Sequence, residues 1–277
     1  MVAATLGEAL RAATARIDRL DARLLVEFVS GCRHADLIAH PELPLDAAQQ
    51  ERLSSLVARR AAGEPLAYLV GGTEFYGLEF AVSPAVLIPR PETELLVELA
   101  LERVAGLAAP RILDLGTGSG AIAVTLAHQL PQAAVTAVDL SPEALEIARG
   151  NAARHGARVN FLAGDWYAPV GEERYDLIVS NPPYVVCGDP HLDRGGLQFE
   201  PPGALTDGIA GGDGLSCIRA IVRGAHRHLA DDGGLLVEHG YDQADGVQAL
   251  LLASGFCDVH SWQDLAGIDR VTGGERC

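Results

Sequence analysis

Residues 112–121 read Ile-Leu-Asp-Leu-Gly-Thr-Gly-Ser-Gly-Ala, an apolar run that passes directly into a glycine-rich turn. The apolar positions that follow, from Ile122 to Leu130, recur with the spacing of a helix. Glycines let the backbone approach a ligand closely, and the first N–H groups of a helix have no partner inside it. The stretch therefore predicts a strand, a ligand-binding turn and a helix.

Two features around this turn indicate a cofactor that carries an adenosine group. The turn fits the G-x-G-x-x-G/A pattern of nicotinamide enzymes. A second predicted strand, 134–138, ends on Asp139, whose carboxylate can accept hydrogen bonds from both hydroxyls of a ribose. Ser-Pro-Glu follows at 141–143, so Asp139 can equally be an acid at the start of a helix. Neither feature distinguishes among the adenosine cofactors.

A later predicted strand stops on Asn181-Pro182-Pro183-Tyr184, a tetrapeptide that suits the alkylation of an amide or ring nitrogen. Such a nitrogen is a poor nucleophile because its lone pair is delocalised, so an enzyme must hold its N–H groups with acceptors. Asn181 offers a side-chain carbonyl, the prolines donate no N–H, and Tyr184 offers a flat face for stacking. The alternative is an ordinary strand that ends in an Asn-Pro turn.

The order of these features along the chain identifies the class of cofactor. Asp165 and Trp166 follow a third predicted strand and come before the tetrapeptide. Asp165 can accept from an adenine amino group, and Trp166 can flank the ring or be a half-buried core residue. A glycine turn, a ribose acid, an Asp-Trp pair and then Asn-Pro-Pro-Tyr is the layout of class I methyltransferases. A nicotinamide enzyme has no use for the tetrapeptide, so the order predicts an S-adenosylmethionine-dependent N-methyltransferase.

Composition limits the function further. The 277 residues are 48% hydrophobic, yet no apolar run reaches the roughly 18 residues of a membrane span, and no signal peptide is evident. The five cysteines are odd in number and contain no C-x-x-C pair, which argues against a zinc site or a disulfide framework and favours a reducing cytoplasm.

The charge of the chain disfavours a nucleic-acid substrate. All 21 basic residues are arginine, and the formal net charge is −16. Residues 1–85 carry 8 Arg and 11 acids, a net of −3, whereas residues 86–277 carry 13 Arg and 26 acids, a net of −13. Because nucleic-acid binding depends on basic patches, we expect no direct contact with a duplex.

The remaining patterns predict how the chain is organised. Residues 1–70 show helical periodicity, and the alternation from 73 to 82 around Gly77 predicts a hairpin. Strands and helices then alternate, which predicts a mostly parallel sheet with both faces covered. The Gly- and Pro-rich stretch from Cys187 to Gly214 is expected to be an irregular loop that recognises the substrate.

Further motifs resemble those of the bacterial peptide-chain release factor glutamine N5-methyltransferases, and the likeness covers nearly the whole chain. Glu-Pro-Leu-Ala-Tyr-Leu at 64–69, followed by Gly-Thr-Glu-Phe-Tyr-Gly-Leu at 72–78, is similar to the family's junction after its helical domain. Val-Leu-Ile-Pro-Arg-Pro-Glu-Thr-Glu at 86–94 is similar to its signature outside the tetrapeptide. Phe-Glu-Pro at 199–201 and Glu-His-Gly at 238–240 also match family stretches.

The resemblance implies an α/β fold, with a class I (Rossmann-like) methyltransferase sheet, a small N-terminal helical bundle and a linking β-hairpin. It divides the chain into a helical release-factor-binding domain (1–72), a hairpin linker (73–85) and an S-adenosylmethionine-dependent methyltransferase domain (86–277). The expected protein is a cytoplasmic monomer that uses no metal and contacts no membrane.

The activity implied by the resemblance is methyl transfer from S-adenosylmethionine to the side-chain amide nitrogen, N5, of the glutamine in the Gly-Gly-Gln motif of class 1 release factors. S-adenosylhomocysteine would be the second product. The catalytic and substrate-binding residues would be Asn181, Pro182, Pro183 and Tyr184, with Arg90 and Glu200 also in the substrate site. The cofactor would be held by Asp114, Gly116, Thr117, Gly118, Ser119, Gly120, Asp139, Asp165, Trp166 and Asn181.

Other functions stay open at this point. Asn-Pro-Pro-Tyr also occurs in enzymes that modify DNA and ribosomal RNA, so an N-methyltransferase acting on adenine or guanine is the alternative. A non-catalytic adaptor that retains the fold and a nicotinamide dehydrogenase are further possibilities.

Several signature residues also have structural interpretations. Arg90 can pair with a surface acid, Glu92 and Thr93 can start a helix, and Glu200 can brace the loop. His239, after a predicted core strand, fits a structural histidine better than a base.

Overall fold

The computed structural model describes residues 4–277, so the first three residues of the predicted helical domain (1–3) lie outside the described residues. The chain forms two compact units. One comprises the residues up to Gly71 together with Asp193–Phe199, and the other comprises Gly72–Leu192 and Glu200–Cys277. The assignment of 193–199 to the N-terminal unit could not be read from the sequence, because it depends on contacts between distant segments.

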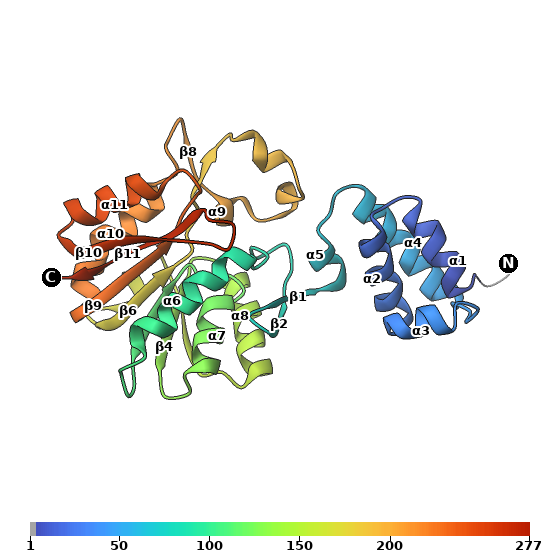
Figure 1. The fold of residues 1–277 in the computed structure, drawn as a ribbon, viewed down its shortest axis with the longest axis horizontal. Helices are drawn as coiled ribbons and strands as arrows, with labels where there is room; N and C mark the ends of the chain where they lie inside the picture. The colour runs from blue at the N-terminus through green and yellow to red at the C-terminus, as the bar shows by residue number, and fades with distance from the viewer. Residues whose placement is uncertain (1–3) are drawn as a thin grey trace. The chain divides into compact units, whose positions relative to one another are not determined.

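The N-terminal unit is a helical bundle (Figure 1). Thr5 and Asp46 each begin a helix with a capping box, which satisfies free N–H groups of the first turn. Apolar residues from all of its helices form one core. The helices are α1 (Leu6–Thr14), α2 (Arg19–Ser30), α3 (His34–Ala39), α4 (Ala47–Ala61) and α5 (Leu66–Val70).

The short segment from the C-terminal half packs tightly against this bundle. It contains the end of one 3-10 helix, η3 (Pro190–Asp193), and all of another, η4 (Leu197–Phe199). A Cβ atom on Gly196 would lie 3.1 Å from Pro65 Cγ and 3.2 Å from the Gly63 carbonyl oxygen. The glycine is therefore needed for this close approach.

The predicted hairpin is present at the start of the second unit. Strand β1 (Gly72–Phe75) pairs antiparallel with β2 (Leu78–Ala81), and Tyr76 and Gly77 turn between them with φ of 52° and 74°. Two positive φ values match the turn that suits the twist of a two-residue hairpin. Phe75 and Phe80 are buried in the core of this unit, so the hairpin is part of its packing.

A large sheet forms the centre of the second unit, as the α/β prediction requires. Within residues 4–277 it has seven strands in the order β10-β11-β9-β6-β3-β4-β5. The stretch from β9 to β5 is parallel. At one edge β11 pairs antiparallel with β9, and β10 pairs antiparallel with β11. The strands are β3 (Arg111–Leu115), β4 (Ala134–Asp139), β5 (Val159–Ala163), β6 (Tyr175–Ser180), β9 (Leu229–Glu238), β10 (Phe256–Gln263) and β11 (Asp269–Arg276).

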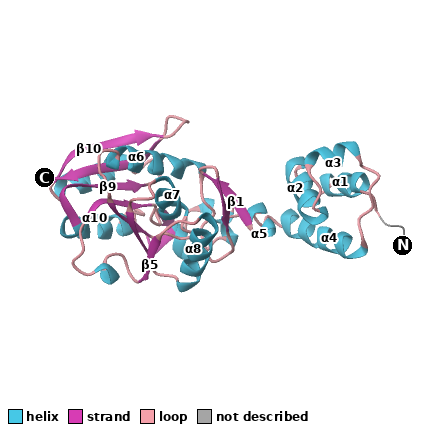
Figure 2. Cartoon of the chain, turned by 90° about the horizontal axis from the view of Figure 1, so that it is seen from below, coloured by secondary structure: helices cyan, strands magenta, loops and turns pink. Residues whose placement is uncertain are grey.

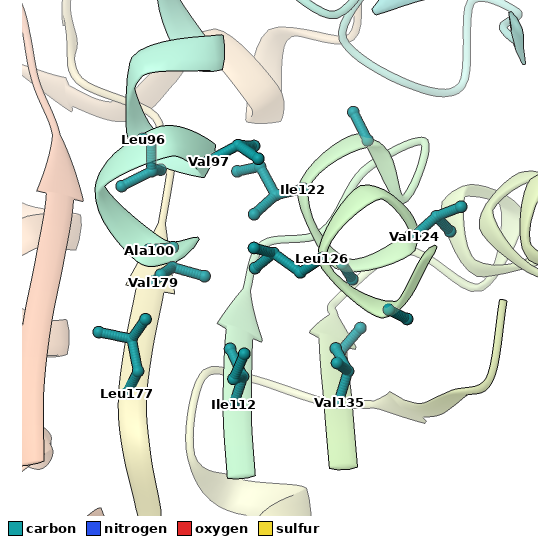
Figure 3. Close-up of a cluster of buried hydrophobic side chains, with 14 of the residues drawn as sticks. Leu96, Val97, Ala100, Ile112, Ile122, Val124, Leu126, Val135, Leu177 and Val179 are labelled. Carbon is teal, nitrogen blue, oxygen red and sulfur yellow. The ribbon is translucent and has the colours of Figure 1, made fainter. Parts of the chain in front are cut away.

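Helices cover both faces of this sheet (Figures 1 and 2). Neighbouring residues of a strand point to opposite faces, so Ile112 packs in one cluster and Leu113 in the other. Figure 3 shows the first cluster, in which Leu96 and Leu126 cover Ile112 and Leu177. This cluster includes α6 (Glu94–Val104), α7 (Ala121–Gln129) and α8 (Pro142–His155), and the other includes α10 (Ser216–His228) and α11 (Ala244–Ala253).

The stretch from Cys187 to Gly214 is more regular than expected. Strand β7 (Val185–Cys187) pairs in parallel with β8 (Thr206–Ala210), and a short helix, α9 (Pro202–Leu205), leads into β8. The prediction of an irregular loop was wrong in this part. Each strand is short and pairs only with a distant partner, so neither produces a local pattern.

One pair of cysteines forms a disulfide that the sequence did not predict. Cys257 and Cys277 are joined, with their Cα atoms 5.8 Å apart. The antiparallel register of β10 and β11 places Cys257 opposite Glu275, which brings the end of the chain back to the start of β10. The number and spacing of the cysteines do not predict this long-range strand register.

Membrane and metal features were searched for in the same structure. No helix among residues 4–277 is long and apolar enough to cross a membrane. Those residues also contain no group of three or more His, Cys, Asp or Glu side chains placed to hold a metal ion.

Asn151 on α8 connects the hairpin to the glycine turn. Its side chain is fully buried. The Oδ1 atom accepts from Ala81 N at 2.8 Å, and Nδ2 donates to the carbonyl oxygens of Ala81 (3.0 Å) and Ser119 (2.9 Å). Removal of this amide would take a hydrogen-bond partner from three backbone groups.

We predict that Asn151→Ala lowers the free energy of unfolding by about 2–3 kcal/mol, because buried backbone groups would lose their hydrogen bonds. Urea unfolding followed by circular dichroism measures the change. Asn160→Ala, at an exposed position of β5, is the matched control and should alter stability by less than about 0.5 kcal/mol. Equal effects of the two substitutions would contradict the role given to Asn151.

Candidate active site

The candidate site lies where the order of the parallel strands reverses. From β3 the chain continues to β4 and β5 on one side, and then returns to β6 on the other side of β3. Leu115 and Ser180 pair at the carboxyl ends of β3 and β6, and Ser180 Oγ donates to the Leu115 carbonyl at 2.7 Å. In parallel α/β sheets, ligands bind in the crevice at such a point.

A cavity of about 540 Å³ opens at this edge of the sheet, a size suited to a small-molecule ligand. It brings together most of the residues singled out from the sequence. Those on its wall are Arg90, Gly116, Thr117, Gly118, Ser119, Asp139, Asp165, Trp166, Asn181 and Pro183. Those outside its wall are Asp114, Gly120, Pro182, Tyr184 and Glu200.

The glycine turn is held by the end of the neighbouring strand. Gly116 N and Thr117 N both donate to the Val138 carbonyl, at 2.8 and 3.0 Å. Gly116, Gly118 and Gly120 have φ of 78°, 55° and 83°, a region that other residues rarely adopt. Gly120 is also needed for packing, because a Cβ atom there would lie 3.1 Å from the Ala148 Cβ on α8.

Asp114 supports the turn from below and does not reach the cavity. It is fully buried, and its Oδ2 accepts from the Thr117 hydroxyl at 2.7 Å. Burial raises the pKa of this carboxyl to about 7, although the Thr117 hydrogen bond opposes the shift. Its Oδ1 is buried without a partner. Asp114 is therefore a structural acid that supports the glycine turn.

Asp139 lies on the cavity wall at the end of β4. Its Oδ2 accepts from Gly118 N at 2.7 Å and its Oδ1 from Ser141 N at 2.9 Å. Burial raises its pKa, and these backbone N–H groups oppose the rise. Ser141 in turn caps α8 by accepting from Ala144 N. Asp139 therefore stabilises the turn and the helix start while facing the cavity.

Asp165 and Trp166 form another part of the wall. Trp166 has a φ of 43°, which is uncommon for a residue other than glycine and is found preferentially at functional sites. Its ring also packs against the core cluster beneath the sheet, and its Cζ3 atom lies 3.6 Å from the position of a Cβ on Gly116. Trp166 is thus both a core residue and a wall residue.

The tetrapeptide divides into two parts. Asn181 and Pro183 line the cavity, and Asn181 Nδ2 donates to Thr93 Oγ1 at 3.1 Å. Tyr184 is not part of the cavity wall. Its hydroxyl donates to Glu238 Oε1 at 3.2 Å, and burial together with Glu238 raises its pKa.

Arg90 and Glu200 are paired with each other. The guanidinium of Arg90 lies on the cavity wall and forms an ion pair with Glu200, which is buried. The second oxygen of Glu200 accepts from Ile88 N at 3.0 Å. Glu200 therefore holds the segment that carries Arg90.

Two residues at the site were not identified from the sequence. Thr93 was interpreted only as a helix start, and Glu238 only as part of a family stretch. Glu238 lies at the end of β9 beside β6, and burial raises its pKa to about 7. A charged residue directly after the apolar run 235–237 was a signal available in the sequence.

Neither His239 nor His191 lines the cavity. His239 is fully buried, and its Nε2 lies 2.7 Å from Thr272 Oγ1 while its Nδ1 lies 2.9 Å from the Gly240 carbonyl. Burial lowers its pKa. His191 is exposed and pairs with Asp189. His239 therefore has the environment of a structural histidine.

The sheet order, the glycine turn after β3 and the crevice at the strand reversal define a class I methyltransferase fold. A family model described as Methyltransferase small domain matches residues 91–193, and one described as PrmC N-terminal domain matches residues 4–71. The chain belongs to the release factor glutamine methyltransferase family, as the resemblance of its motifs predicted.

Individual relatives carry this assignment. The release factor glutamine methyltransferase of Bordetella pertussis is 55% identical over 93% of this chain and 95% of its own length. That of Burkholderia pseudomallei is 53% identical over 98% of this chain and 96% of its own length. Among solved structures, the 16S rRNA N2 G1207 methyltransferase of T. Thermophilus, in complex with AdoMet and guanosine, shares the fold with a TM-score of 0.55. It is 21% identical and covers 74% of this chain and 50% of its own.

The raised pKa of Asp114 predicts a pH-dependent stability. The native pKa of Asp114, about 7, exceeds the ordinary value of 3.8. Its contribution to the free energy of unfolding is therefore full below pH 3.8 and is lost as pH rises through 7. Asp114→Asn cannot ionise, so between pH 5 and 8 its free energy of unfolding should fall less than that of the wild type, by on the order of 2 kcal/mol.

Urea unfolding across this pH range measures the difference between the two proteins. Glu238 titrates in the same window and remains in the variant, so part of the pH dependence should persist. Parallel stability profiles of the two proteins would show that Asp114 does not titrate as described.

Proposed function

We propose that this chain transfers a methyl group from S-adenosylmethionine to the N5 amide nitrogen of the glutamine in the Gly-Gly-Gln motif of class 1 release factors. The observation that carries the proposal is that Asn181 and Pro183 share one cavity with the glycine turn and Asp139. A site for an adenosine cofactor and an acceptor group for an amide thus open into the same space. Membership of the release factor glutamine methyltransferase family supports the choice of substrate.

The residues of the cavity fit the cofactor. Asp139 offers carboxylate oxygens to a ribose, and Trp166 offers an aromatic surface to an adenine, with Asp165 beside it as an acceptor. Gly116, φ 78°, keeps the backbone of the turn accessible to a ligand. When bound, S-adenosylmethionine supplies an electrophilic sulfonium methyl group and leaves as S-adenosylhomocysteine.

The tetrapeptide would hold and orient the acceptor amide. Because Asn181 Nδ2 already donates to Thr93, its Oδ1 is the atom left to accept an amide hydrogen of the substrate. The Tyr184 carbonyl is taken by Gln243 Nε2 at 3.0 Å, so a carbonyl of the Pro-Pro turn would accept the second hydrogen. When two acceptors hold the N–H groups of the amide, the nitrogen lone pair is left to face the methyl donor. Positioning then supplies most of the catalysis. Proton loss follows methyl transfer without an obligatory general base.

We also propose that the helical domain, residues 1–72, grips the body of the release factor, with 73–85 as a hairpin linker and 86–277 as the catalytic domain. The protein would act as a monomer. The net charge of −13 over residues 86–277 counts against methylation of adenine or guanine in a nucleic acid.

The function is tested by transfer of radiolabelled methyl from S-adenosylmethionine to a purified release factor. The wild-type factor should be labelled, whereas its Gln→Ala variant at the Gly-Gly-Gln motif and duplex DNA should not be. Asn181→Ala should reduce kcat by roughly 100-fold or more and leave cofactor affinity within about threefold, because Asn181 acts on the acceptor. Label on DNA, or on both factor variants equally, would overturn the choice of substrate.

For the cofactor site, we predict that Asp139→Ala weakens S-adenosylmethionine binding by roughly 10- to 100-fold, because it removes a carboxylate that is placed to accept ribose hydroxyls. Isothermal titration calorimetry measures the dissociation constant. Asp245→Ala, at an exposed position of α11 away from the cavity wall, is the control and should leave the constant unchanged. Unaltered binding by Asp139→Ala would remove Asp139 from the cofactor site.

A further inference from the structure

The amide of Asn181 must present its oxygen to the acceptor, yet an Asn amide can rotate and present its NH₂ group. In the structure this group donates to Thr93 Oγ1 at 3.1 Å. Thr93 lies at the N-cap position of α6, where a threonine commonly accepts from a backbone N–H, but its side chain makes no capping bond. It is buried on the cavity wall, with 3% of its surface exposed. The Thr93 hydroxyl oxygen therefore accepts from Asn181 instead of capping the helix.

A second residue determines which way the Thr93 hydroxyl points. Glu238 is 1% exposed, and its Oε1 accepts from the Tyr184 hydroxyl at 3.2 Å. Its Oε2 is buried without a partner at hydrogen-bond distance. Burial disfavours its charged form, and the Thr93 and Tyr184 hydroxyls favour it as hydrogen-bond donors. Oε2 is thus an unsatisfied buried acceptor, and the Thr93 hydroxyl is a donor that favours the charged carboxylate.

We propose that Thr93 and Glu238 are positioning residues, which together keep the Asn181 amide oxygen directed at the acceptor. An ionised carboxylate only accepts hydrogen bonds, so the Thr93 hydroxyl would direct its one hydrogen toward Glu238. The Thr93 oxygen can then only accept, which fixes Asn181 Nδ2 against it and leaves Asn181 Oδ1 free. The proposal rests on the proposed function, since it concerns the acceptor that Asn181 holds.

A change at Glu238 would reverse the direction of these hydrogen bonds. A glutamine there, or a protonated Glu238, can donate to the Thr93 oxygen. The Thr93 hydrogen would then turn to Asn181 Oδ1, and the amide would rotate to present its NH₂ group to the substrate. A donor facing the N–H groups of an amide repels them, so the nucleophilic nitrogen would lose its orientation.

The charged and titratable groups around Glu238 come from several elements. Arg270 on β11 favours the carboxylate, and Glu92 in the 3-10 helix η1 (Pro91–Thr93) opposes it. Tyr184 supplies a hydroxyl, and the neighbouring His239 is turned to Thr272. With burial, these groups leave the Glu238 pKa at about 7. Methyl transfer should therefore gain rate as pH rises through this value.

The experiment uses the full chain with S-adenosylmethionine and a release factor. Thr93→Val keeps the shape but removes the hydroxyl, and should lower kcat on the order of 10- to 100-fold while cofactor affinity changes less than about threefold. Thr93→Ser should retain activity within about threefold, and Glu238→Gln should lose both rate and the pH dependence near 7. Thr125→Val is the matched control, because Thr125 is a fully buried threonine of α7 with no hydroxyl partner and lies away from the cavity wall.

A second measurement needs neither cofactor nor substrate. The asparagines of the chain are Asn151, Asn160 and Asn181, so the side-chain amide of Asn181 can be assigned by labelling asparagine with ¹⁵N. Its resonance should shift with pH around 7 in the wild type, as Glu238 ionises. The shift should be absent from Thr93→Val and Glu238→Gln and should persist in Thr125→Val.

The outcomes separate the two proposals. If the wild type methylates the release factor and Thr93→Val has the kcat of Thr125→Val, the positioning role is overturned. Equal losses in Thr93→Ser and Thr93→Val would also overturn it, because only the shape of the side chain would then matter. If the wild type leaves the release factor unmodified while the Asn181 resonance follows Glu238, the proposed function fails and the hydrogen-bond chain stands.

Discussion

The pairing of β3 with β6 is the contact on which the site depends. Leu115 and Ser180 lie opposite each other at the carboxyl ends of these strands, 65 positions apart in the chain. The glycine turn follows one strand and the Asn-Pro-Pro-Tyr segment follows the other. Without this register the glycine turn and the Asn-Pro-Pro-Tyr segment would belong to separate parts of the surface. The two apolar clusters, one on each face of the sheet, hold the register in place.

Buried acids organise the edge of the sheet around that pairing. Asp114 accepts from Thr117 beneath the turn, Asp139 accepts from two backbone N–H groups, and Glu238 accepts from a tyrosine hydroxyl. Burial raises the pKa of all three. Each carboxylate is shielded from water and accepts hydrogen bonds from nearby donors, which hold the adjoining loop in place. The rigidity of the loops around the cavity thus comes from polar groups, while the core beneath them is apolar.

Local patterns in the sequence were sufficient for the fold class and for most of the cavity wall. The run 112–121 contains its strand, turn and helix within ten positions, and Asp139 and the tetrapeptide each end an apolar strand. Features that depend on distant partners were not predictable: the β7–β8 pairing, the Cys257–Cys277 disulfide and the packing of 193–199 with the N-terminal unit.

Glu238 shows how the same rule could have been carried further. In a parallel sheet all strands end at one edge, so the residue after each apolar run is a candidate for the crevice. Asp139 at the end of β4 and Asn181 after β6 both meet this criterion. Strand β9 is parallel to β6 and ends on Glu238, which meets the same criterion. The sequence does not indicate a role for this acid, because Thr93 lies 88 positions before Asn181 and only the fold brings the two side chains together.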